Sequence, residues 1–133
     1  MSQRFVQSPW VTDVFNTTNA TPTVSSVTSF VIPSGAVGFV EIRAVLRNTT
    51  TGVGAMLYAT RPFQNIVGTL TLLGALTSIV GSVAAGLALP IGNAGLLTAG
   101  VDLTTSGTTV QPRVTGIAAT NIEWLLDVRY CIH

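Results

Sequence analysis

Apolar and polar residues alternate along two parts of the chain, and both parts are predicted to be β-strands. In residues 37–47 the even positions are apolar, whereas Glu41 and Arg43 fall on odd positions. In residues 121–133 the same alternation collects apolar side chains, Trp124 among them, on one face. Because successive side chains of a strand point to opposite faces of a sheet, each segment is predicted to bury one face.

The middle of the chain is apolar for long enough to raise the question of a membrane span. Residues 66–89 contain no charge, and none occurs between Arg61 and Asp102, while a transmembrane helix needs only about 20 apolar residues. Glycine recurs at short intervals, threonine favours strands, and no basic residue lies close to either end. We therefore expect three short strands with glycine-bearing turns, and a membrane-inserted protein is the weaker alternative. The expected strands are 68–74, 75–81 and 82–92.

The rest of the pattern completes an all-β prediction. A turn at 32–35 precedes the strand at 37–47, whose antiparallel partner is expected at 55–60, ending before Pro62. Residues 100–116 predict a hairpin that turns at 106–107. About eight short strands and no helix indicate an antiparallel β-sandwich or a jelly-roll-like barrel.

The first 29 residues differ from the rest because they are rich in Thr, Asn and Ser and carry only sparse aromatic residues. They predict a partly irregular, extended N-terminal arm over 1–29, followed by a β-sandwich domain over 30–133. The start of the chain lacks the apolar core of a secretory signal, so we expect synthesis in the host cytoplasm.

The low content of charged residues limits how the surface of the protein can be solvated. Charged residues make up 8% of the 133 positions, against roughly 25% in an ordinary soluble domain. Such a chain has too few charges to solvate its own surface, so other copies are expected to cover part of it. The six basic residues are all arginines, are scattered, and give a net charge of +1, which predicts no nucleic-acid partner.

No catalytic or metal-binding pattern is present in the sequence. The single histidine, His133, and the single cysteine, Cys131, cannot build a zinc site between them. Glu123 and Asp127 share a strand face but lie four residues apart, roughly 13 Å by strand rise, which is too far for a glycosidase carboxylate pair. We expect no enzyme activity and no cofactor; Cys131 is expected to be a small interface residue.

Three segments, in order, carry a resemblance to a known family. They are "IPSGAVGFVEIRAVLRNTTTG", "GTLTLLGALTSIVGS" and "VTGIAATNIEWLLDVRY". Together they resemble a small β domain of tailed-bacteriophage virion proteins, which occurs as a capsid decoration (cement) protein and as the terminal module of fibres. The resemblance implies a homotrimer on the virion surface with the major capsid protein as partner. We expect a capsid decoration protein that stabilises capsomer junctions by non-covalent contacts.

Two alternatives stay open. The first is the receptor-binding tip of a phage tail or head fibre. The second, from another class, is a carbohydrate-binding module in which Trp10 or an exposed Tyr58 stacks on a sugar.

Two groups of residues are predicted to make contacts. Phe5, Trp10 and Phe15 are expected to anchor the arm on the capsid, because aromatic residues dominate many binding contacts; alternatively, they close this subunit's own core. Polar contacts between subunits are expected at Glu41, Arg43 and Arg47; the alternative is a solvated outer face.

Overall fold

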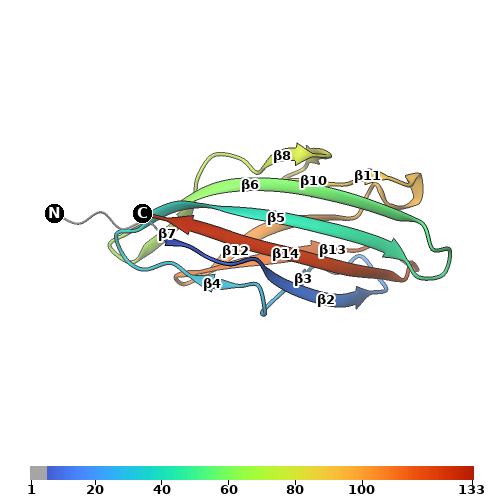
Figure 1. Cartoon of the computed structure of the whole chain (residues 1–133), viewed down its shortest axis with the longest axis horizontal. Helices are drawn as coiled ribbons and strands as arrows, with labels where there is room; N and C mark the ends of the chain where they lie inside the picture. Colours follow the sequence, from blue (N-terminus) through green and yellow to red (C-terminus); the bar gives the residue numbers. More distant parts are fainter. Residues whose placement is uncertain (1–5) are drawn as a thin grey trace.

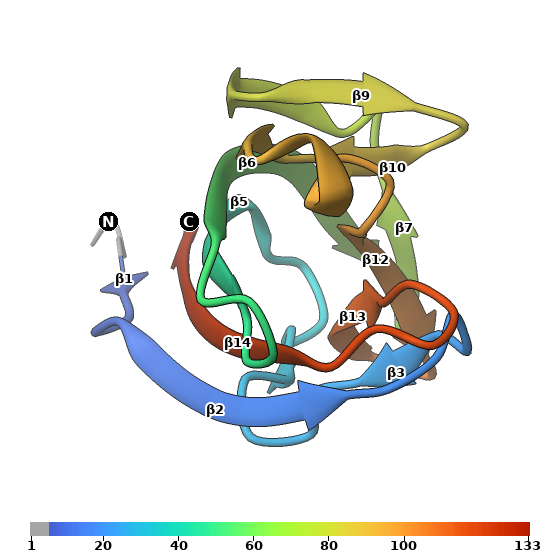
Figure 2. The same cartoon turned by 90° about the vertical axis from the view of Figure 1, so that its right-hand side faces the viewer.

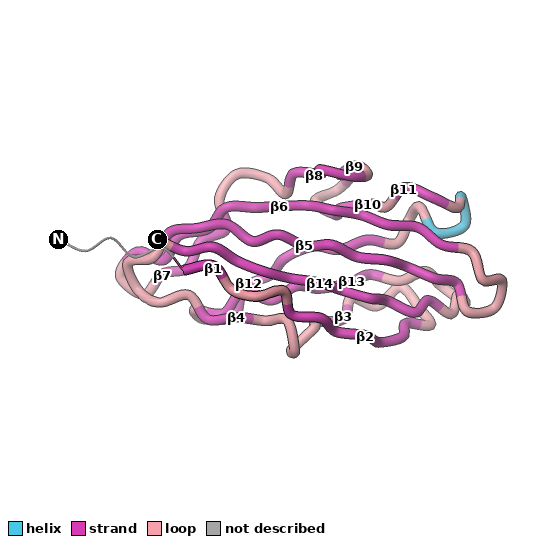
Figure 3. The backbone as a smooth tube through the Cα atoms, in the orientation of Figure 1, coloured by secondary structure: helices cyan, strands magenta, loops and turns pink. Residues whose placement is uncertain are grey.

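The computed structural model describes residues 6–133 and is built almost entirely from β-strands. Two antiparallel sheets pack on each other along the length of an elongated molecule (Figure 1). Within the described residues the only helical element is the short 3₁₀ turn η1 (Ala94–Leu96), drawn in cyan in Figure 3. The predicted all-β sandwich is confirmed.

The larger sheet has eight strands in the order β1-β14-β5-β6-β11, with β2 also paired to β14, and β7 and β8 also paired to β6. Its strands are β1 (Val6–Gln7), β2 (Val11–Thr17), β5 (Val37–Asn48), β6 (Gly54–Ile66), β7 (Thr69–Leu72), β8 (Thr77–Val80), β11 (Ile91–Gly92) and β14 (Ile122–Ile132).

The smaller sheet has six strands in the order β3-β13-β12-β10-β9, with β4 also paired to β13. Its strands are β3 (Thr23–Val24), β4 (Phe30–Val31), β9 (Ser82–Ala84), β10 (Leu87–Leu89), β12 (Gly100–Ser106) and β13 (Thr109–Thr115). Viewed along the strands, the two sheets curve around a common interior (Figure 2).

The core lies between the sheets and follows the alternation seen in the sequence. The even positions of β5 from Val40 to Leu46 are buried, and so are the even positions of β14 from Ile122 to Val128. Burying each large apolar side chain contributes roughly 1.5–3 kcal/mol. Trp124 is fully buried at the centre, and its indole N–H donates to the Thr17 hydroxyl of β2 at 2.8 Å.

The apolar middle of the chain forms strands, as expected, and contributes β7, β8, β9 and β10. The expected strand at 82–92 is divided into β9, β10 and β11, and this division helps to raise the strand count of the described residues from the expected eight to fourteen. Gly81 and Gly86 adopt positive φ values of 104° and 76°, which allow the chain to reverse at these points. No helix in the described part of the chain is both long and apolar enough to cross a membrane.

The expectation that β6 ends before Pro62 is wrong, because β6 continues to Ile66. Pro62 pairs with Phe39 of β5, and its carbonyl accepts from the Leu73 N–H at 2.8 Å on the opposite edge. An N–H at Pro62 would point to that same edge, just beyond the end of β7 at Leu72. The proline therefore removes no hydrogen bond of the β5–β6 ladder, and the Leu73 carbonyl that such an N–H would meet accepts from Arg61 Nε at 3.3 Å instead.

The described part of the N-terminal segment is attached to both sheets. β1 and β2 pair with β14, and β3 pairs with β13. Residues 6–29 thus add strands to both sheets of their own subunit. The domain boundary at residue 29 stays a prediction, and Phe5 lies outside the described residues.

Candidate functional site

The outer face of the larger sheet is the side of β2, β14, β5, β6 and β11 that points away from the core. Its side chains form rows that cross the strands, because residues paired in register lie at one level of the sheet. The register defines three successive rows. We call them the charged patch (Thr12, Asp127, Arg43 and Tyr58, with Glu41 and Arg129 beside them), the apolar row (Val14, Leu125, Val45, Met56 and Ile91) and the end row (Asn16, Glu123 and Arg47).

The charges of the charged patch are paired within the chain. Arg129 Nε lies 2.9 Å from Glu41 Oε1, and Arg43 Nη2 lies 3.2 Å from Asp127 Oδ2. The Tyr58 hydroxyl donates to the second oxygen of Glu41. Glu41 and Arg43 were expected to pair with neighbouring subunits, yet each finds a partner on the adjacent strand of its own sheet, because β5 and β14 run side by side over eleven register pairs.

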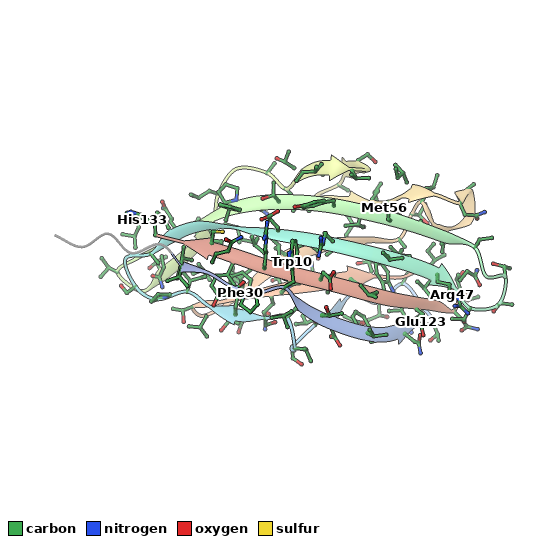
Figure 4. All side chains as sticks on the ribbon, viewed as in Figure 1. Trp10, Phe30, Arg47, Met56, Glu123 and His133 are labelled. Atoms are coloured by element: carbon green, nitrogen blue, oxygen red, sulfur yellow. The ribbon has the colours of Figure 1, made fainter. Side chains whose placement is uncertain are left out.

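Trp10 covers this patch from outside. Its ring centroid lies 3.7 Å from the Arg43 guanidinium carbon and 4.6 Å from that of Arg129. A cation over an aromatic face is attracted by the ring quadrupole, with about 0.5–1 kcal/mol at partly exposed sites. Figure 4 shows Trp10 over β5 and β14 near the middle of the sheet. The residue expected to anchor a capsid contact is therefore engaged by two arginines of its own subunit.

The ion pairs shift the titration of the patch. Burial raises the pKa of Glu41, but the hydrogen bonds from Tyr58 and Arg129 outweigh that effect and leave this pKa below its ordinary value. The hydrogen bond to Glu41 also raises the pKa of Tyr58. A carboxylate held ionised by two donors is a poor general base, so the patch favours a structural role over acid–base catalysis.

The apolar row is exposed across five neighbouring strands. Leu125 pairs in register with Val14 on one side and Val45 on the other, Val45 pairs with Met56, and Met56 pairs with Ile91. The exposed fractions are 58% for Val14, 40% for Leu125, 50% for Val45, 39% for Met56 and 53% for Ile91. A continuous apolar band of this kind, bordered by polar rows, is typical of an interaction surface.

The end row lies beyond the apolar row, where Glu123 and Arg47 face each other in the register (Figure 4). Both side chains are exposed. They are not among the three ion pairs found in residues 6–133. Arg47, expected at a subunit contact, is therefore the predicted polar residue that keeps its charge available.

The remaining predicted residues lie elsewhere. Phe15 pairs with Trp124 and packs against the core of its own subunit. Cys131 is buried, and His133 is exposed at the C-terminus. Tyr58 was considered as an exposed sugar platform, but it is only partly exposed and its hydroxyl is engaged by Glu41.

Away from the outer face, the described residues offer few candidates for a metal-binding or ligand-binding site. Residues 6–133 hold no group of three or more potential metal ligands among His, Cys, Asp and Glu. On the smaller sheet Arg113 binds Asp102 through two contacts, at 2.9 Å and 2.6 Å, which ties β12 to β13. Two shallow cavities of about 220 and 420 Å³ lie beside β14; backbone turns and apolar side chains line them, together with Ser8 and Tyr130 in one and His133 in the other.

Comparisons with known proteins give two phage tailspikes among the similar solved structures. One is tailspike protein gp49 of Acinetobacter baumannii bacteriophage Fri1, a capsular polysaccharide depolymerase; it is 16% identical, and the alignment covers 95% of this chain and 19% of the tailspike with a TM-score of 0.42. The other is the tailspike of Acinetobacter baumannii phage AM24, at 11% identity, 93% and 26% coverage and a TM-score of 0.41.

The chain thus spans about a fifth to a quarter of those tailspikes. At these TM-scores and identities the alignments assign no function to this chain. No protein-family model and no curated protein matches the sequence.

Proposed function

We propose that the chain is a non-enzymatic structural protein of a tailed-phage virion, and that it serves as a capsid decoration protein bound to the major capsid protein. The observation that carries the proposal is the exposed apolar row. Five large apolar side chains cross one sheet face of a chain that is only 8% charged. A surface of this kind is stable in water when other subunits cover it.

The chemistry of the outer face supports a contact role. Glu41 and Asp127 are neutralised by arginines, and Trp10 covers those arginines. The patch therefore presents rigid, paired groups and no free nucleophile or base. Such groups suit recognition between proteins better than turnover of a substrate.

The receptor-binding tip of a fibre is a second candidate within the same class. The elongated shape favours it, since β5, β6 and β14 run along the long axis of the molecule (Figure 1). The carbohydrate-binding module is less well supported, because the Tyr58 hydroxyl and the Trp10 ring are engaged within the chain.

Co-sedimentation with empty phage heads tests the proposal. A decoration protein is expected to pellet with heads and to saturate at a copy number set by the capsid lattice. A fibre tip is expected to bind host cells and not to pellet with empty heads. Absence of binding to heads at protein concentrations of tens of micromolar would reject the decoration role, and glycan-dependent quenching of tryptophan fluorescence would favour the carbohydrate module.

A further inference from the structure

We infer that the apolar row and the end row form the contact between copies of this chain, and that a rotation axis parallel to the strands of the larger sheet relates the copies. The inference deepens the proposed function and rests on it for its biological setting. The inference identifies which face of the subunit other copies cover, as the low content of charged residues leads us to expect. It also specifies that neighbouring subunits point in the same direction.

The register of the rows gives the first argument. Each row lies at a single level along the strands, because its members are direct register partners. A rotation about an axis parallel to the strands keeps every residue at the same height along the strands. The apolar row of one copy then meets the apolar row of the next, and polar rows meet polar rows. Aligned packing of two sheet faces is a common arrangement in proteins.

Charge complementarity gives the second argument. In the end row the acid is on β14 and the base is on the neighbouring β5. The axis proposed here is a two-fold axis, in place of the three-fold axis of the homotrimer that the resemblance implies. It runs along the strands between β14 and β5 and exchanges these two strands. Glu123 of one copy then faces Arg47 of the second copy, and the reciprocal pair forms at the same time. In an isologous contact one favourable pair is always made twice.

The reversed arrangement fails the same test. A two-fold axis along the apolar row would bring the end row of one copy onto the charged patch of the other. Glu123 would then approach Asp127, and Arg47 would approach Arg43. Asp127 and Arg43 are already paired with each other, and Trp10 covers Arg43, so neither residue of the end row would gain an opposite charge. The distribution of charges therefore favours copies that point in the same direction.

Trp10 sets the boundary of the proposed contact between copies on the side of the charged patch. Its indole stands above Arg43 and Arg129 and covers the charged patch. The open part of the outer face is therefore the apolar row together with the end row. Its members are exposed and reach from β2 to β11.

Sedimentation velocity of three proteins tests the inference: the wild type, Val45→Lys and Val31→Lys. Val45 is 50% exposed in the apolar row, and the matched control Val31 is 62% exposed on β4 of the other sheet. The wild type and Val31→Lys are expected to sediment as oligomers. Val45→Lys is expected to weaken association by about tenfold or more, because it buries an unpaired ammonium group. Far-UV circular dichroism checks that every variant is folded.

A monomeric wild type, or a Val45→Lys variant that assembles as well as Val31→Lys, would overturn the inference. The outcome is independent of the head-binding experiment. Self-association with no affinity for heads would remove the decoration role and keep the proposed interface between copies. Head binding by a monomer would keep the decoration role and remove the proposed interface.

A charge exchange tests the direction of the axis. Glu123→Arg alone and Arg47→Glu alone are each expected to weaken self-association, because like charges then face each other across the contact. An equimolar mixture of the two variants restores opposite charges and is expected to assemble more tightly than either variant alone. A mixture that assembles no better than its components would exclude the proposed axis.

Discussion

Removal of the Thr17 hydroxyl is expected to destabilise the protein although the change is nearly isosteric. Thr17 is 6% exposed, and its hydroxyl accepts from the Trp124 indole N–H at 2.8 Å. Thr17→Val keeps the shape of the side chain but leaves that N–H buried without a partner, since Trp124 is fully buried. An unsatisfied buried donor costs about 1–3 kcal/mol.

Urea unfolding followed by far-UV circular dichroism measures this loss. With a slope of about 1–3 kcal/mol per molar urea, the midpoint is expected to fall by about 1 M. All proteins are compared at one protomer concentration, because assembly adds to apparent stability. Thr17→Ser keeps the acceptor and is expected to retain most of the stability. Thr18→Val changes the exposed neighbour and controls for the added methyl group.

The reasoning is refuted if Thr17→Val unfolds at the same urea concentration as Thr18→Val. That result would mean that the hydrogen bond between Thr17 and Trp124 contributes little to the stability of the fold.

Three further changes test other parts of the structure. Gly38→Ala places a Cβ 1.9 Å from the Cys131 carbonyl oxygen, so thermal denaturation is expected to show a loss of about 1–3 kcal/mol. The lowered pKa of Glu41 means that its stabilising effect is present above the ordinary value of 4.5 and is lost as the pH falls through the lower, folded-state value; Glu41→Gln is expected to flatten the acid limb of a stability-against-pH curve. Trp10→Ala removes the ring over Arg43, and chemical denaturation is expected to show a loss of about 0.5–2 kcal/mol.

The strands could be predicted from the sequence because alternation is a local signal. The alternation in residues 37–47 and 121–133 predicted both strands and most of their buried faces, and the glycine spacing separated the apolar middle into strands. Glu41 and Cys131, which the alternation placed on the mainly polar faces, are buried as well. Pro62 misled the prediction of β6, because the direction of its missing N–H, away from β5, is a tertiary feature that no local pattern reports.

The outer face could not be derived in the same way, because its rows depend on the register between strands that are far apart in the sequence. Leu125 is an apolar residue on a mainly polar strand face, but only its pairing with Val14 and Val45 reveals a continuous band. The position of Trp10 over Arg43 has no sequence signal, since 33 residues separate the two by their numbering.

The antiparallel pairing of β1 with the end of β14 has a practical consequence. Val6 lies opposite Ile132, so the described start of the chain and its C-terminus share one pole of the molecule (Figure 1). The β5–β6 loop and η1 lie at the other pole (Figures 1 and 3). A peptide fused to the C-terminus would therefore emerge away from those loops, and in an assembly whose members all point one way, grafted loop epitopes would be displayed together on a single side.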